Sequence, residues 1–361
     1  MTNRERVRNC ATNKPIDRSP FSFYFGPWEE TIERWRIENG KDANAWLEGF
    51  GFDKPVNMAS GFVNHYYYPA FENKVLMRNG DKIICQNFLG QTVECMDSKS
   101  GIPKILKNQV SCREDWEKLK KERLNPDDKG RFPQNWDEIV KNLNDNDAPV
   151  QLGAYPCGLY GTLRDLMGVE ESLCAFYYEP DLVKDIMDYL TDFWISIYSQ
   201  ICEDVKIDII HIWEDMSGKQ GSLISPELIK KFMLPNYRKI KDFAEKHDIP
   251  IFQVDTDGNC EELIPLFADA GVNMMLPFEV SAGCDVVSLR KKYPYMSMMG
   301  GIDKQEIAKG KDAIDKELKR ISPLINQTGY FPALDHLIPP EISYDDYCYF
   351  VNSLKEMIFS A

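Results

Sequence analysis

The sequence predicts an α/β fold, a (β/α)8 TIM barrel with an N-terminal elaboration, and three observations support this. The chain has 361 residues, 43% of them hydrophobic, which suits one large barrel. From residue 148 onward, short apolar runs alternate with longer amphipathic segments, as in parallel βα units. No G-x-G-x-x-G or G-x-x-x-x-G-K-[ST] motif follows a predicted strand, which disfavours nucleotide cofactors and the alternative fold, a doubly wound open sheet.

The chain is predicted to form a single domain over residues 1–361, in which residues 1–147 contribute strands and helices that cap the barrel. Gly and Pro divide the N-terminal part into short strands at Ser19–Phe25, Lys74–Met77, Lys82–Asn87 and Gln91–Cys95. A polar connection at Asn125–Gly130 separates two short helical patterns. The predicted barrel strands are Pro149–Ala154, Ile207–Trp213, Pro250–Val254, Val272–Leu276, Tyr295–Met299 and Gly329–Leu334. The predicted helices are Glu179–Glu203, Ser225–Lys246, Cys260–Ala270, Cys284–Lys292, Asp303–Ile321 and Ser343–Phe359.

The charge balance disfavours several classes of partner. With 43 basic and 57 acidic side chains, the net charge is -14, whereas nucleic acids and anionic membranes bind clustered Lys and Arg. No stretch approaches the roughly 20 apolar residues that span a bilayer, and no apolar segment follows the opening residues, so a cytoplasmic location is expected. The ten cysteines include no C-x-x-C pair, which fits a reducing interior such as that of an anaerobe.

Polar residues follow several predicted strands, where the active groups of a TIM barrel lie. They are Glu214-Asp215, Asp255-Thr256-Asp257, Glu279, Gly300-Gly301-Ile302-Asp303 and Asp335-His336. Each also has a structural explanation. Asp303 is expected to cap the following helix, and Asp257 can equally cap a helix beginning near Cys260. Glu279 and His336 are harder to explain as caps, so a functional role is favoured for both.

The other three histidines are weaker candidates. His211 lies within an apolar strand, where a residue of the core or barrel interior is expected. His65 is equally well explained as a residue of a rim or lid. His247 lies at a helix end, where its interaction with the helix dipole is favourable.

A metal site unites the strongest candidates. Asp255, Asp257, Glu279 and His336 offer oxygen and nitrogen ligands suited to a divalent ion, with zinc expected. Such an ion polarises a substrate oxygen or sulfur. Without metal, Glu279, Asp215 and His336 can perform acid–base chemistry, because clustered carboxylates raise one another's pKa.

The order of several motifs resembles the uroporphyrinogen decarboxylase-like superfamily, which implies a TIM barrel. The motifs are Asp215-Met216-Ser217-Gly218, Leu223-Ile224-Ser225-Pro226-Glu227, Met233-Leu234-Pro235, Asp257-Gly258-Asn259, Leu276-Pro277-Phe278-Glu279, Gly300-Gly301-Ile302-Asp303 and Pro339-Pro340, with a looser match from Arg4 to Arg18. True uroporphyrinogen decarboxylases carry an Arg-rich stretch after the N-terminal Pro-rich turn. No Arg lies between Arg18 and Arg34 here, which disfavours a porphyrinogen polyanion.

The superfamily has another branch, the cobamide-dependent methyltransferases, and the chain resembles this branch more. Its members include methylcobamide:coenzyme M methyltransferases and O-demethylase components. Their zinc-binding His-x-Cys pair falls on Asp255 and Asp257, and their later Cys falls on His336. Oxygen ligands make a harder ion, which favours cleavage of a methyl ether, with the metal or an acid such as Glu279 activating the oxygen.

The resemblance implies that a corrinoid accepts the methyl group. The chain has no D-x-H-x-x-G element, so the corrinoid is expected on a partner protein that docks over the barrel mouth. Phe25, Trp28, Tyr67 and His211 are expected to bind the substrate, although such aromatic clusters are as often core. A decarboxylase of a non-porphyrin acid and a non-catalytic binding barrel remain as alternatives.

Overall fold

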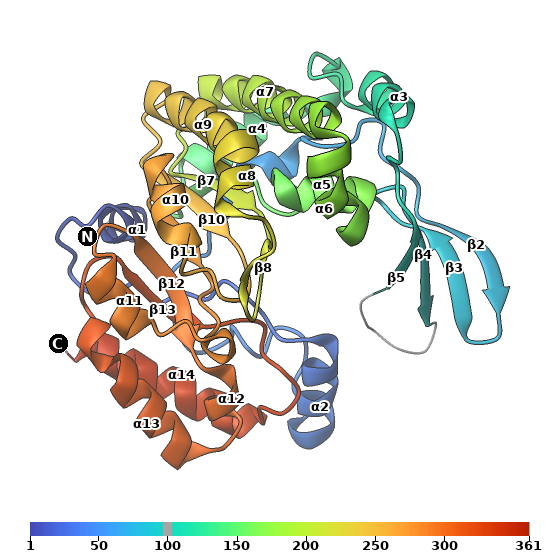
Figure 1. Ribbon diagram of the computed structural model, residues 1–361. Coiled ribbons are helices and arrows are strands. Elements are labelled where there is room, and N and C mark those ends of the chain that lie inside the picture. Colours follow the sequence, from blue (N-terminus) through green and yellow to red (C-terminus); the bar gives the residue numbers. More distant parts are fainter. Residues whose placement is uncertain (97–102, 361) are drawn as a thin grey trace.

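A computed structural model describes residues 1–96 and 103–360, and its centre is a curled parallel sheet (Figure 1). The seven strands lie in the order β1, β6, β7, β10, β11, β12, β13, each parallel to its neighbours. Their bounds are β1 Asn57–Met58, β6 Val150–Leu152, β7 Ile209–Trp213, β10 Ile251–Asp255, β11 Met274–Leu276, β12 Ser297–Ile302 and β13 Tyr330–Leu334. The predicted α/β class and all six predicted barrel strands are confirmed, with ends shifted by a few residues.

Most of the helices pack around this sheet, whereas α2 and α3 lie beside it (Figure 1). The bounds of the helices are α1 Asn3–Ala11, α2 Glu29–Asn39, α3 Arg113–Arg123, α4 Trp136–Asn144, α5 Tyr160–Met167, α6 Val169–Tyr178, α7 Pro180–Asp204, α8 Pro226–Leu228, α9 Leu234–Lys246, α10 Leu263–Asp269, α11 Val286–Lys292, α12 Lys304–Ile307, α13 Lys311–Ile321 and α14 Tyr344–Phe359. The longest, α7, buries Leu182, Ile186, Leu190, Trp194, Ile197 and Ile201. This spacing of three to four residues gives one apolar face, which packs into the main core.

Two predicted helices are interrupted. The predicted helix Asp303–Ile321 is divided into α12 and α13, because Gly310 adopts a positive φ of 89° between them. The predicted helix Ser225–Lys246 contains a π-helical turn at Ile229–Met233 between α8 and α9. The predicted helix at Cys260 begins only at Leu263.

A complete eight-stranded barrel is not seen. No strand within the described residues joins β13 to β1, and the expected strand Ser19–Phe25 is absent. Two of its backbone donors pair with side chains instead: Ser19 N–H donates to Asn326 Oδ1 and Phe21 N–H to Asp53 Oδ2. Strand pairing needs those donors for a neighbouring backbone, so the segment runs along the open edge as an irregular strap.

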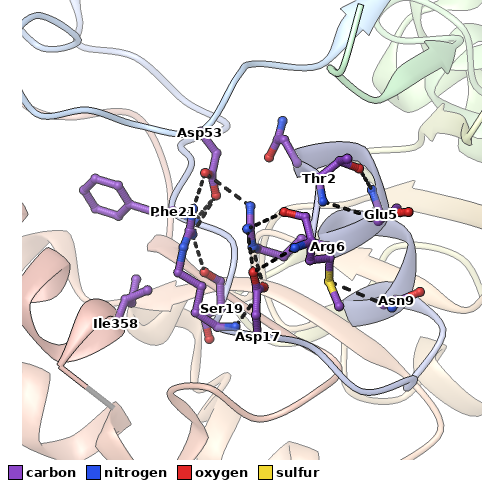
Figure 2. A network of polar contacts seen from close by, with 12 residues as sticks. Thr2, Glu5, Arg6, Asn9, Asp17, Ser19, Phe21, Asp53 and Ile358 are labelled. Carbon is purple, nitrogen blue, oxygen red and sulfur yellow. Dashed lines mark hydrogen bonds and ion pairs between the residues drawn. The ribbon is translucent and has the colours of Figure 1, made fainter.

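Charged side chains hold this strap in place (Figure 2). The guanidinium of Arg6 in α1 donates two hydrogen bonds of 2.8 Å to Asp17. Arg18 donates to Asp53 Oδ2 at 2.8 Å, and Asp53 also accepts the Phe21 N–H. At the far end, Pro27 forms an isolated parallel bridge with Ile338, just beyond β13. The chain at the end of the strap therefore crosses the carboxyl ends of the strands.

A separate antiparallel sheet projects away from the parallel sheet (Figure 1, cyan and teal). It contains β2 Lys74–Asn79, β3 Lys82–Gln86, β4 Thr92–Met96 and β5 Lys104–Lys107, in that order. The three strands expected here are confirmed. Gln91 and Asn108 join this sheet to α5, since their side-chain amides donate to the carbonyls of Asp165 and Met167.

The polar connection Asn125–Gly130 lies between α3 and α4, as expected, and leads into a short turn at Lys129–Arg131. The buried Arg131 side chain donates to the Asn125 and Tyr66 carbonyls, so the connection is anchored. None of the helices in the described part of the chain has the length and apolarity to cross a membrane.

Candidate active site

The floor of the site is a buried polar cluster inside the sheet. His211 on β7 and Gln253 on β10 are register partners, which brings their side chains together. The Gln253 amide nitrogen lies 2.7 Å from His211 Nδ1, and the Tyr24 hydroxyl lies 3.2 Å from His211 Nε2. Burial lowers the pKa of His211 to about 3, so the ring is neutral. With the amide donating to Nδ1, the ring proton lies on Nε2 and faces Tyr24.

Asp255 lies directly above this cluster as the last residue of β10. Its Oδ2 atom is 3.7 Å from His211 Nε2. Burial raises the pKa of Asp255 well above its usual range, and repulsion from Asp257 and Asp215 adds to the increase, whereas a hydrogen bond from Tyr24 opposes it. The result is a carboxyl group that holds its proton at higher pH than an ordinary aspartate, as a general acid must.

Asp257 and His336 meet from opposite sides of the mouth. Asp257 lies on the loop after β10 and His336 follows β13, and 3.3 Å separates Asp257 Oδ2 from His336 Nε2. Phe25 from the strap stacks on the His336 ring, with the ring centres 4.9 Å apart and the planes at 22°. The strap therefore positions both Tyr24 and Phe25 at the site.

Glu279 closes the neighbouring part of the rim. Its Oε2 atom accepts the Gly258 N–H at 2.9 Å, and its Oε1 atom lies 3.5 Å from Lys304 Nζ. Gly258 has φ +74°, and a Cβ there would come within 2.6 Å of the Ser217 carbonyl. Only glycine therefore lets the loop that carries Asp257 approach so closely.

Asp335 supports the same rim from below. It accepts the backbone N–H groups of Val280 and Lys304, at 3.0 and 3.2 Å. Burial raises the pKa of Asp335 to about 6. These contacts tie the loop after β13 to the loops after β11 and β12.

Asp215 is held by Arg164 from α5. The guanidinium donates 2.7 Å hydrogen bonds to both the Asp215 carbonyl and its Oδ2 atom. The same guanidinium lies over the Trp213 ring, 5.1 Å from its centre. Asp215 has φ 42°, a strained conformation for a residue with a side chain, and these contacts help to hold it.

Glu214 anchors this turn from within the protein. Its buried carboxylate accepts the N–H groups of Leu159, Tyr160 and Gly161 at the start of α5, and the Tyr237 hydroxyl. The first backbone N–H groups of a helix have no acceptor within the helix, and they stabilise such an anion. Glu214 therefore has a structural role, and Asp215 beside it faces the mouth.

The expected zinc ligands divide into separate contacts. Asp257 pairs with His336, Glu279 with Lys304, and Asp255 with the floor cluster. Across residues 1–96 and 103–360, no three His, Cys, Asp or Glu side chains form a group that could hold a metal ion. The side chains as placed do not fit a metal centre. The zinc expected from the sequence is therefore not assigned a role at this site.

Most of the residues predicted for the site lie together. Those that share direct contacts or neighbouring loops at the strand ends are Phe25, His211, Asp215, Asp255, Asp257, Glu279 and His336. Trp28 is half-exposed at the start of α2, where its N–H donates to the Ile338 carbonyl. Tyr67 is buried, and its ring packs against those of Tyr66 and Phe71.

The structure also tests the capping explanations. Asp303 caps α12 by accepting the Gln305 N–H, as expected. Asp257 caps no helix, since α10 begins at Leu263 and Asp257 faces His336. Gly300, Gly301 and Ile302 lie within β12 rather than in the loop after it. His247 is the residue that ends α9, and His65 Nδ1 lies 2.7 Å from the Ser60 carbonyl.

Four side chains at the site were not predicted: Tyr24, Gln253, Arg164 and Lys304. Tyr24 adjoins Phe25 in an aromatic run, and Gln253 is a polar residue in an apolar strand, which is a signal for a barrel interior. Lys304 follows the capping Asp303 directly. Arg164 lies in α5, after the first predicted barrel strand, in a segment for which the sequence predicts neither a helix nor a strand.

One solved structure and one family model agree with this architecture. A solved methyltransferase from Methanosarcina mazei is similar in fold, with a TM-score of 0.62, 16% identity and coverage of 100% of both chains. A B12-independent methionine synthase from Shewanella sp. W3-18-1, solved with selenomethionine, shows a TM-score of 0.36 and 12% identity, over 82% of this chain and 76% of its own. A search of curated proteins gives no match. The model of the uroporphyrinogen decarboxylase (URO-D) family matches residues 80–357, more than half of the chain, so this protein belongs to that family.

Proposed function

We propose that this protein is a methyltransferase that moves a methyl group from a methyl ether, such as a methoxylated aromatic, to the Co(I) corrinoid of a partner protein. The observation that carries the proposal is Asp255, a buried carboxyl group with a raised pKa at the mouth of a URO-D-family barrel. An ether oxygen leaves easily only if it gains a proton or a comparable positive partner. The methyltransferase similar in fold supports the same reaction class.

The chain's own residues supply the acid and its surroundings. Asp255 donates its proton to the ether oxygen as the methyl–oxygen bond breaks, and the bonding electron pair stays on the oxygen. The partner's corrinoid, when docked, supplies the electron pair that forms the new bond to the methyl carbon. The product alcohol or phenol leaves uncharged, and Asp255 regains a proton from water. Tyr24 and His211 hold the Asp255 carboxyl from below.

A polyanionic substrate fits this mouth poorly. Arg18, the last arginine before the strap, is bound to Asp53, and Arg34 pairs with Glu38. Neither guanidinium is free to bind the carboxylates of a porphyrinogen. The structure thus supports the expectation drawn from the missing arginines.

The family match favours one second candidate, decarboxylation of a smaller acid. The same protonated Asp255 could then deliver a proton to the carbon that loses carbon dioxide. This reaction needs a cation to receive the substrate carboxylate. Arg164 and Lys304 are both paired at the mouth, so methyl transfer is preferred.

The test uses free cob(I)alamin as the methyl acceptor and 2-methoxyphenol as the donor, under anaerobic conditions. The wild-type protein is expected to form methylcobalamin and catechol in equal amounts. Asp255→Asn should be strongly impaired. Asp192 is an exposed residue of α7 that pairs with Lys239 of α9, and Asp192→Asn should retain full activity. If a panel of methyl ethers gives no methylcobalamin while an acid substrate releases carbon dioxide, the decarboxylase function replaces this proposal. Inactivity with both substrate classes would favour the binding-only barrel.

A further inference from the structure

Both cations that form ion pairs with the site's carboxylates in the described part of the chain are already neutralised. Arg164 donates to Asp215 through two nitrogens, each at 2.7 Å, and lies over Trp213. Lys304 Nζ lies 3.5 Å from Glu279 Oε1. A substrate carboxylate would have to displace one of these carboxylates to gain a cationic partner. Displacement leaves a protein acid without its partner, so the exchange gives little net attraction.

Negative charge at the mouth is less fully compensated. Asp257 has the most open carboxylate of the site, with 35% of its side chain exposed, against 31% for Asp215, 20% for Glu279 and 10% for Asp255. Its partner is an imidazole, since His336 Nε2 lies 3.3 Å from Asp257 Oδ2, whereas Asp215 and Glu279 are each paired with an arginine or a lysine. An approaching anion therefore meets repulsion, and a cation meets attraction.

We infer that the site selects methyl donors by charge: a methoxylated aromatic that carries an ammonium group is preferred over an uncharged one, and a methoxylated aromatic acid is rejected. The inference rests on the proposed methyl transfer and names the substrate class of that same site. The ammonium group lies against Asp257, and the aromatic faces at the mouth, such as Phe25, receive the donor ring.

Three donors that share one ring and one linking chain test the inference. All have a 4-hydroxy-3-methoxyphenyl ring with a two-carbon chain, which ends in an ammonium group (3-methoxytyramine), a hydrogen (4-ethyl-2-methoxyphenol) or a carboxylate (the phenylpropanoate). Binding is measured by calorimetry without corrinoid, and methyl transfer to cob(I)alamin is measured separately. The cationic donor should bind at least tenfold more tightly than the carboxylate, with the uncharged donor between them. Raising the salt concentration should narrow this ratio.

Asp257→Asn removes the open charge while keeping the shape of the side chain. It should reduce severalfold the ratio of the affinity for the cationic donor to the affinity for the uncharged donor. Asp192→Asn, which removes an equal charge from the outer face of α7, should leave the ratio as it is. A ratio that survives Asp257→Asn overturns the role given to Asp257.

The outcomes separate this inference from the proposed function. Equal binding of the three donors, or tightest binding of the carboxylate, overturns the charge selection even if all three are demethylated. Binding in the expected order without any methylcobalamin upholds the selection and overturns the methyl transfer. Failure of all three donors to bind overturns both.

Discussion

Replacing Glu214 by glutamine tests how the turn that contains Glu214 and Asp215 is held in place. The carboxylate receives four hydrogen bonds: Leu159 N–H at 3.1 Å and Tyr237 O–H at 2.6 Å on Oε1, and Tyr160 N–H at 2.7 Å and Gly161 N–H at 3.1 Å on Oε2. A glutamine has one acceptor oxygen, so its amide nitrogen must replace the other. In the better orientation, the amide nitrogen takes the place of Oε1. The Tyr237 hydroxyl can then turn to accept a hydrogen bond from this nitrogen, but the Leu159 N–H loses its acceptor.

The cost follows from these contacts. One buried N–H without an acceptor costs about 1–3 kcal/mol. The two bonds that remain lose the strengthening that an ionised acceptor gives, about 1 kcal/mol more. We therefore expect Glu214→Gln to lower the free energy of unfolding by about 2–4 kcal/mol.

Urea unfolding followed by tryptophan fluorescence measures this loss. Glu227→Gln is the matched control, because Glu227 is an exposed residue in the first turn of α8. Its free energy of unfolding should stay within about 0.5 kcal/mol of the wild type. Methyl transfer by folded Glu214→Gln should also fall, because the Glu214 N–H donates to the Asp255 carbonyl and Asp215 follows directly. A loss below about 1 kcal/mol would refute the view that this carboxylate anchors α5 to β7.

Four further predictions concern the acid, its support, the strap and the metal. Asp255→Asn should lower kcat about 100- to 10,000-fold, and pH–rate profiles should show a wild-type decline at high pH that the variant's residual rate lacks. Tyr24→Phe removes the hydroxyl facing His211 and should lower kcat about tenfold in steady-state assays while circular dichroism stays unchanged. Hydrogen bonds from Arg6 lower the pKa of Asp17 to about 2, so their contribution is complete above pH 4 and is lost as the pH falls through 2. Because Asp17 is partly exposed, its ion pair with Arg6 should contribute only about 1 kcal/mol to the free energy of unfolding, measured by acid unfolding. Arg6→Gln should remove this pH-dependent contribution. Chelator treatment should leave methyl transfer unchanged within about twofold, with metal content checked by mass spectrometry.

The sequence predicted six of the seven strands of the parallel sheet and most of the site, because both depend on local signals; the two-residue strand β1 was not predicted. Predominantly apolar runs of five to seven residues mark the buried parallel strands, and the polar residues that end them mark the mouth. Asp255, Asp257, Glu279 and His336 were found in this way. Their pairing was not, since which carboxylate faces which cation depends on contacts far apart in the chain, such as Lys304 with Glu279.

The strap shows why the remaining part was missed. Residues 19–25 contain enough Phe, Tyr and Ser to suggest a strand, but Asp53 and Asn326 take their backbone donors. Those partners lie 32 and 307 residues away in sequence, so no local pattern reveals them. Arg164 was missed for the same reason, because its importance comes from Asp215, 51 residues further on.

The most direct test of the central claim follows the methyl carbon itself. The donor is 2-methoxyphenol with a carbon-13 methoxy group, mixed with the protein and cob(I)alamin and examined by NMR. We predict that the label appears in a methyl group bound to cobalt, with one unlabelled catechol released for each, and that Asp255→Asn slows this transfer at least 100-fold. A label that remains on oxygen with the wild-type protein, across methyl ethers of every charge, would contradict the proposed function.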